Sequence, residues 1–173
     1  KKHNYNQDVD MPRIAEMARQ HQPGILVVDR WVNGLYENYL TPENKVPEKA
    51  LSVPWESCIT MATSWSYVKT DKYKSVRELV HLLVDVVAKG GNLLLNIGPS
   101  PEGEWAPDAY DRLKGIAAWM KVNKESIYET RAIAPYKEGK VRLTRKKEGG
   151  AVYAIYLPEK NENRAPRTIG LKS

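Results

Sequence analysis

The stretch VVAKGGNLLLNIGPSP, residues 86–101, decides which fold this chain can adopt. It begins in the last turn of a predicted helix, passes through a Gly-Gly turn, and continues as a short apolar run that ends in a second turn. Leu93, Leu94 and Leu95 follow one another without alternation, which is typical of a parallel strand covered on both faces. Because such a strand needs neighbours on both sides, the stretch predicts one segment of a larger α/β sheet.

The helix predicted before this strand has clear sequence signals at both ends. Its apolar residues recur at a 3.6-residue period over residues 76–87. Ser75 and Glu78 have the spacing of a capping box, and Gly90 can adopt the left-handed conformation that often ends a helix. The strand then ends near Asn96, and α/β folds place their active sites at this carboxyl end of their strands.

Further segments extend the α/β pattern in both directions. Apolar spacing predicts a helix over residues 10–22 and another from residue 107 to 120, and apolar runs predict buried strands at 25–28 and within 55–61. Residues 33–55 form a long connection rich in Asn, Pro, Tyr and Glu, and a loop of this length in a compact domain is commonly functional.

The pattern changes beyond residue 130. Two β-rich runs at residues 141–144 and 151–157, joined by a Glu-Gly-Gly turn, predict an antiparallel hairpin that opens a separate β domain. We therefore predict two units, residues 1–130 and residues 131–173. Three parallel strands are too few to close a barrel and leave two open edges, so the first unit is either a small open sheet or the later half of a (β/α) barrel.

The amino-acid composition excludes several classes of protein and of site. The 173 residues are 42% hydrophobic and 28% charged, which is typical of a globular protein, and no apolar run approaches the roughly 18 residues of a membrane span. The net charge of +6 comes from scattered basic residues apart from a cluster within residues 142–147, and this cluster indicates a solvated hairpin more than a nucleic-acid site. Cys58 is the only cysteine, so an internal disulfide and a cysteine-based metal site are excluded. Because the chain opens with Lys1 and no start signal, we expect it to begin inside a longer polypeptide.

Six short motifs are spread along the chain, and both their residues and their order are informative. They are VDRW (28–31), TPE (41–43), WESC (55–58), SWSY (64–67), GGNLLLNIGP (90–99) and ESIY (125–128). Together they resemble the α-L-fucosidases of glycoside hydrolase family 29, over about residues 5–158. The resemblance implies an α/β fold: the later part of a (β/α)8-like TIM barrel, followed by the beginning of an antiparallel β-sandwich domain.

The resemblance also implies a reaction. It is the hydrolysis of terminal α-L-fucosyl residues from an oligosaccharide or glycoconjugate by a retaining exo-glycosidase, which needs two carboxyl groups roughly 5 Å apart. No segment matches the family's nucleophilic Asp, so the nucleophile is expected upstream of Lys1, and the upstream polypeptide is the implied partner. No cofactor, metal ion, nucleic acid or membrane span is implied. The implied location is periplasmic or secreted in a bacterium and lysosomal in a eukaryote.

Two carboxylates compete for the role of catalytic acid/base. By the resemblance, Glu43 lies in the long loop where this residue usually falls, while Glu56 belongs to the more regular WESC motif but at the start of a strand, where a structural role is equally reasonable. Glu37 and Glu48 remain further alternatives. Whichever residue acts needs a raised pKa in a dry site, because it must hold a proton near neutral pH.

Three other residues are expected to bind the sugar. Arg30 would hydrogen-bond the ring oxygen or a hydroxyl, and Trp65 would pack its indole against the C6 methyl of fucose. Trp31 is a weaker candidate, as is Asn96.

Two hypotheses of function other than an enzyme stay open. A sugar-binding or remnant chain that cannot turn over its ligand is one alternative, since the chain lacks a nucleophile. A nucleotide-binding module is the other, suggested by Gly90, Gly91 and Gly98, but these glycines precede the strand or follow it singly, and no G-x-G-x-x-G motif is present.

Overall fold

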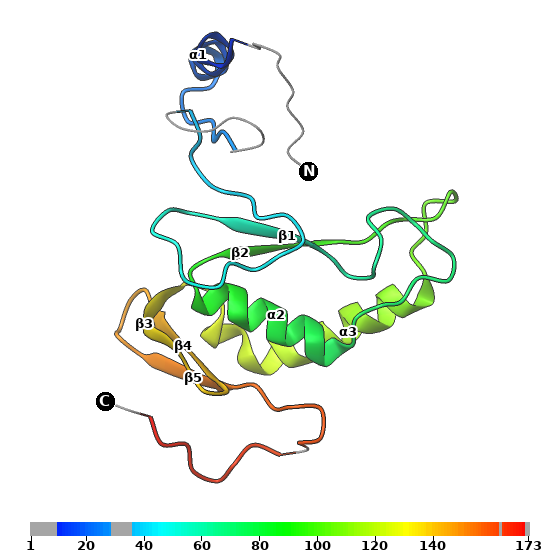
Figure 1. Cartoon of the computed structure of the whole chain (residues 1–173), viewed down its shortest axis with the longest axis vertical. Helices are drawn as coiled ribbons and strands as arrows, with labels where there is room; N and C mark the ends of the chain where they lie inside the picture. Colours follow the sequence, from blue (N-terminus) through cyan, green and yellow to red (C-terminus); the bar gives the residue numbers. More distant parts are fainter. Residues whose placement is uncertain (1–9, 29–35, 163, 172–173) are drawn as a thin grey trace.

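The computed structural model of the chain describes residues 10–28, 36–162 and 164–171. The elements in chain order are α1 (Met11–His21), β1 (Glu56–Thr60), α2 (Val76–Ala88), β2 (Asn92–Asn96), α3 (Pro107–Asn123), the 3-10 turn η1 (Lys124–Ser126), β3 (Thr130–Glu138), β4 (Val141–Lys146) and β5 (Val152–Tyr156). The pair β1–β2 lies over α2 and α3, the sheet β3–β4–β5 lies on the other side of α2, and α1 lies apart at one end (Figure 1).

The helix–turn–strand unit predicted from residues 86–101 is confirmed. The Ser75 hydroxyl accepts a hydrogen bond from the Glu78 amide at 3.2 Å, and the Glu78 carboxylate accepts one from the Ser75 amide at 2.7 Å, so the capping box is complete. Gly90 has φ +82°, as a residue after the helix end requires. Gly91 is needed for another reason, because a Cβ there would clash with the Trp55 indole.

The parallel sheet extends beyond its two regular strands. β1 and β2 pair in register from Glu56↔Asn92 to Thr60↔Asn96. Single parallel bridges then join residues 40 and 43 to residues 55 and 58, and residue 28 to residue 39. Four chain segments therefore lie side by side in one direction, and part of the connection that we predicted as irregular runs between them.

The prediction of a buried strand at residues 25–28 is wrong. Only Val28 pairs, and Leu26 is 70% exposed. The expectation that β2 is covered on both faces is also wrong for the described residues, since Leu94 is 50% exposed. The apolar run specified a strand, but burial depends on neighbours: among the described strands β2 pairs only with β1, and the helices cover one face of this pair.

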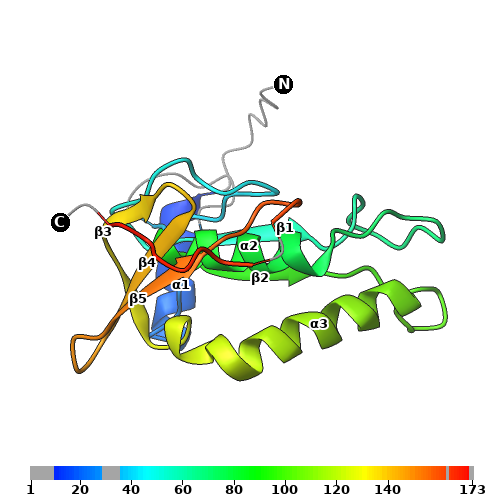
Figure 2. The ribbon, with the colours of Figure 1, turned by 90° about the horizontal axis from the view of Figure 1, so that it is seen from below.

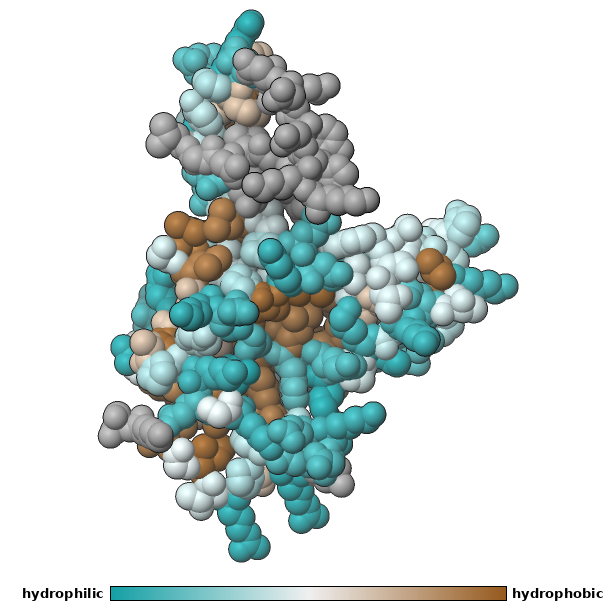
Figure 3. Space-filling view, viewed as in Figure 1, coloured by the Kyte–Doolittle hydropathy of each residue, from teal (hydrophilic) through white to brown (hydrophobic). Residues whose placement is uncertain are grey.

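Helix α2 takes part in two hydrophobic clusters. Leu79 packs with Met61 and Ala109, and Leu95 of β2 packs against this group. Val80 and Val84 pack with Ile127, and Ile155 of β5 packs against that second group. α2 therefore lies between the two sheets and joins them, and apolar surface is visible around it and β1–β2 (Figure 3).

The antiparallel sheet begins where the sequence pattern changes. The hairpin of β4 and β5 is confirmed, and Gly149 and Gly150 both have positive φ in its turn. β3, which pairs with β4, was not predicted. The division into units 1–130 and 131–173 stays a prediction. Within the described ranges, no helix has both the length and the apolar character needed to cross a bilayer.

The contact between α3 and α2 at Gly115 gives a testable prediction. A Cβ on Gly115 would lie 2.9 Å from Cγ1 of Val76 and closer still to Cγ2. We expect Gly115→Ala to lower the free energy of unfolding by about 1–2 kcal/mol in urea denaturation, since overpacking outweighs the better helix propensity of Ala. Adding Val76→Ala supplies the missing space, so the double variant should lose less than the sum of the two single losses. Additive losses would contradict this contact.

Candidate active site

The candidate site lies at the carboxyl ends of β1 and β2. The strands end side by side at Thr60 and Asn96, and the Met61 amide donates to the Asn96 carbonyl at 2.9 Å, which extends the pairing by one step. The loops that follow both strands project from this end of the sheet (Figures 1 and 2). Among the described residues, the Asn96 side-chain oxygen is buried there without a hydrogen-bond partner.

The loop after β1 is anchored by a carboxylate. Asp71 accepts hydrogen bonds from the amides of Thr63 at 3.2 Å and Ser64 at 3.0 Å, and from the Thr63 hydroxyl. The Thr63 hydroxyl is the main cause that lowers the pKa of Asp71 to about 2, and the backbone amides act in the same direction. Asp71 therefore holds the turn that immediately precedes Trp65.

The same loop is tied down at two further points. Lys74 Nζ donates to the carbonyl oxygens of Thr60 at 2.6 Å and Ala62 at 3.1 Å. A Cβ on Gly98 would lie 2.5 Å from the Tyr67 amide nitrogen, so the loop packs directly on the backbone that follows β2. Trp65, at 39% exposure, is thus an accessible indole on a fixed loop.

Trp105 in the loop after β2 pairs with Tyr110 of α3, and sequence reasoning missed this aromatic pair. The rings of Trp105 and Tyr110 lie 5.6 Å apart, and the Tyr110 hydroxyl donates to Glu104 at 2.9 Å. Trp105 is 38% exposed. The available signal was a Trp in a turn-rich loop directly after a predicted strand.

The two candidate carboxylates lie on one face of the sheet. Glu43 is in register with Cys58, and Cys58 is in register with Leu94, so these three residues form a row across the sheet. The next row contains Leu95, which packs against the helices, so the row with Glu43 faces away from them. Glu56 lies on the same face as Cys58, two residues and roughly 7 Å toward the amino end.

The surroundings of the two carboxylates differ. Glu43 is exposed, and the chain reverses direction at the next residue, Asn44, which has φ +50°. Glu56 is half-buried and lines a cavity of about 680 Å³ together with Gly91 and Thr130, at the amino ends of the strands. Glu43 is therefore the candidate nearer to the end of β1 from which the Trp65 loop leaves. Arg30 and Trp31 lie outside the described residues.

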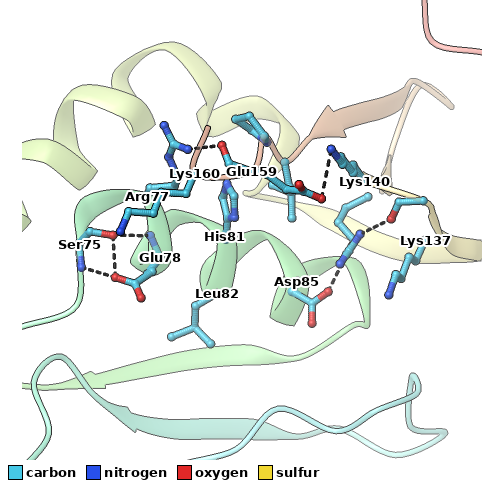
Figure 4. A pocket seen from close by; sticks show the side chains of 14 residues that line it. Ser75, Arg77, Glu78, His81, Leu82, Asp85, Lys137, Lys140, Glu159 and Lys160 are labelled. Atoms are coloured by element: carbon cyan, nitrogen blue, oxygen red, sulfur yellow. Dashed lines mark hydrogen bonds and ion pairs between the residues drawn. The ribbon is translucent and has the colours of Figure 1, made fainter. Parts of the chain in front are cut away.

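A cavity of about 910 Å³ lies elsewhere, between α2 and the antiparallel sheet (Figure 4). Two ion pairs involve its lining residues: Arg142 with Asp85 at 2.6 Å, and Lys140 with Glu162 at 2.6 Å. Burial, with smaller contributions from Arg77 and Arg142, lowers the pKa of His81 in its wall. The cavity lies on the side of α2 that faces the antiparallel sheet, and we place it outside the candidate site.

Parallel strands, a layer of helices on one face and anchored loops at the carboxyl ends define an α/β protein that carries its site at this edge. The alpha-L-fucosidase family profile matches residues 1–125. The plasma alpha-L-fucosidase of Homo sapiens is 35% identical, and the match covers 77% of this chain and 31% of that protein. This chain therefore belongs to the alpha-L-fucosidase family, glycoside hydrolase family 29.

Solved structures agree with this assignment. Alpha-L-fucosidase isoenzyme 1 from Paenibacillus thiaminolyticus is 33% identical with a TM-score of 0.74, over 78% of this chain and 36% of that one. The Thermotoga maritima alpha-fucosidase in complex with fucose is 31% identical with a TM-score of 0.68, over 80% of this chain and 32% of that one. The chain spans about a third of the length of the relatives that it matches.

The Asp71 anchor gives a prediction with a defined pH dependence. Since folding lowers this pKa to about 2, the ionised carboxylate stabilises the loop above the unfolded pKa of about 4, and this contribution is lost as the pH falls from about 4 to about 2. Amide hydrogen exchange of residues 62–68 should therefore accelerate, relative to intrinsic rates, over this range. Asp71→Asn should remove the pH dependence and lower the protection at neutral pH.

A matched control is Asp111→Asn. The Asp111 carboxylate is exposed and forms a long ion pair, 3.7 Å, with the Lys114 ammonium three residues further along α3. This substitution should leave exchange in residues 62–68 unchanged. If Asp71→Asn and wild type exchange alike, the carboxylate does not anchor the loop.

Proposed function

We propose that this chain is the later part of the (β/α)8 catalytic barrel, with the start of the β-sandwich, of a retaining α-L-fucosidase that removes terminal α-L-fucosyl residues from oligosaccharides or glycoconjugates. The observation that carries the proposal is the placement of Glu43 beside β1, on the helix-free face of the sheet, with the anchored Trp65 loop leaving β1. Membership of the alpha-L-fucosidase family supports it. The two predicted units, residues 1–130 and 131–173, are part of this proposal.

Glu43 acts as the acid/base in this proposal. It protonates the oxygen of the leaving group while a second carboxylate attacks the anomeric carbon, and it then removes a proton from the water that releases fucose. The attacking carboxylate comes from a part of the polypeptide outside these 173 residues. Glu56 is the alternative acid/base, and its place at the amino end of β1 favours Glu43 over it.

The proposal also assigns three residues to binding of the sugar. Trp65 packs its accessible indole against the C6 methyl of fucose, where other hexoses carry a hydroxyl that needs a partner. In this proposal Arg30 binds the ring oxygen or a hydroxyl, and Trp31 is a weaker candidate for a sugar contact. No cofactor is required for this reaction.

The names of the relatives also bear on the location of this protein. The relatives include proteins named plasma alpha-L-fucosidase, and this name supports secretion. The location that we propose is periplasmic or secreted in a bacterium and lysosomal in a eukaryote. A non-catalytic sugar-binding chain is the alternative if no attacking carboxylate joins Glu43.

Substitution of Glu43 tests the proposal in the full-length polypeptide. We expect Glu43→Gln to lower kcat/KM about 10²- to 10⁴-fold for an alkyl fucoside, whose leaving group needs a proton, and much less for a dinitrophenyl fucoside. Azide should rescue the variant and give the fucosyl azide of retained configuration, because it replaces water on the face that the acid/base serves. Glu56→Gln is the matched comparison, and the same behaviour in that variant alone would transfer the role to Glu56.

Substitution of Trp65 tests sugar specificity. Trp65→Ala should reduce the preference for an aryl α-L-fucoside over the aryl α-L-galactoside about tenfold, since a hydrophobic contact with one methyl group contributes on this scale. Trp105→Ala removes an equally accessible indole from the neighbouring loop and serves as the control. An unchanged ratio of kcat/KM values in Trp65→Ala would place the methyl group elsewhere.

A further inference from the structure

The segment that follows Glu43 turns back along β1 and is held there. Asn44 donates its amide to the Cys58 carbonyl at 2.8 Å, and its φ of +50° reverses the chain. The Ser57 hydroxyl then donates to the Lys45 carbonyl at 2.8 Å. Glu43 therefore stands at the tip of a reversal. Its neighbours Pro42 and Asn44 are hydrogen-bonded to Cys58 of β1, and the returning arm, residues 45–48, continues from this tip.

The returning arm is fastened to α2 by a buried charge. Lys89, whose side chain is 8% exposed, donates to the Pro47 carbonyl at 2.8 Å and to the Asp85 carboxylate at 2.7 Å. Burial by itself would raise the pKa of Asp85, but hydrogen bonds from Lys89 and Arg142 outweigh it and hold this pKa below its ordinary value. The pair is thus ionised, and the ammonium of Lys89 is fixed against the arm.

Residues of the antiparallel sheet also hold the returning arm. The Tyr136 hydroxyl of β3 donates to the Glu48 carbonyl at 3.0 Å, and the Lys89 ammonium lies 5.9 Å from the centre of the Tyr136 ring. Arg142 of β4 donates to Asp85 at 2.6 Å, and Asp85 forms part of the wall of the cavity between α2 and this sheet (Figure 4). Two strands of the antiparallel sheet therefore reach the arm, one directly and one through Asp85 and Lys89.

We propose that Tyr136 and Lys89 are positioning residues for Glu43, and that the antiparallel sheet thereby takes part in the protonation step. This inference rests on the proposed function, because it concerns the residue assigned there as the acid/base. Tyr136 touches neither the substrate nor Glu43 in this scheme; it fixes the Glu48 carbonyl, and the arm transmits that constraint through Lys45 and Asn44 to the tip. A proton donor displaced from its place loses much of its effect on the rate.

The test compares two tyrosines of the same sheet in the full-length polypeptide. Tyr136→Phe removes the hydroxyl that binds the arm, and Tyr156→Phe removes a hydroxyl that donates to Glu162 at 3.1 Å, away from the arm. For Tyr136→Phe we expect kcat/KM for an alkyl fucoside to fall about tenfold, a part of the 10²- to 10⁴-fold that a placed general acid contributes, with little change for a dinitrophenyl fucoside. Tyr156→Phe should change neither value.

Three outcomes separate the claims. If Tyr136→Phe lowers kcat/KM equally for the alkyl and the dinitrophenyl fucoside, the role of Tyr136 is structural and the inference is overturned. If Glu43→Gln shows the leaving-group dependence but Tyr136→Phe and Lys89→Met both behave like Tyr156→Phe, the inference fails while the proposed function stands. If Glu43→Gln itself lacks that dependence, the assignment of the acid/base fails, and the inference fails with it.

Discussion

The structure depends on one helix that must be apolar on two sides. α2 packs Leu79 against the group that covers the parallel strands and Val84 against the group that reaches the antiparallel sheet, so most of its surface is removed from water. Charged groups that lie between the two sheets at the end of this helix need partners. Asp85 in the last turn of α2 and Lys89, the residue that caps its end, are accordingly paired with each other and with groups on both sides.

The candidate site is rigid for local reasons. Hydrogen bonds that the Asp71 carboxylate accepts and the Lys74 ammonium donates fix the loop after β1, and the close approach at Gly98 joins it to the backbone that follows β2. Such a loop can present Trp65 to a ligand without first being ordered, and the conformational entropy lost on binding is correspondingly smaller. The segment that follows Glu43 is different, because it contacts residues far away in the chain: the Tyr136 hydroxyl, 88 positions further on, donates to the Glu48 carbonyl.

The sequence predicted the elements better than their surroundings. The capping box at Ser75 and the turn at Gly90 follow from interactions within a few residues, so the pattern is sufficient to find them. The pairing of residue 28 with residue 39, the reversal at Asn44 and the strand β3 were missed, because each depends on a partner distant in the sequence. The same limit applies to the site: Glu43 and Glu56 could be picked out, but not their rows on the sheet.

The amino-acid sequence by itself determined the helix–turn–strand unit, the antiparallel hairpin and the resemblance to the α-L-fucosidases, since propensity, capping and turn chemistry act over short stretches of chain. Only the tertiary structure decided which carboxylate lies nearer the edge that carries Trp65, and that Tyr136 and Lys89 hold the segment beyond Glu43. The physical reason is that sheet register and buried ion pairs join residues far apart in the chain, and no local pattern encodes them.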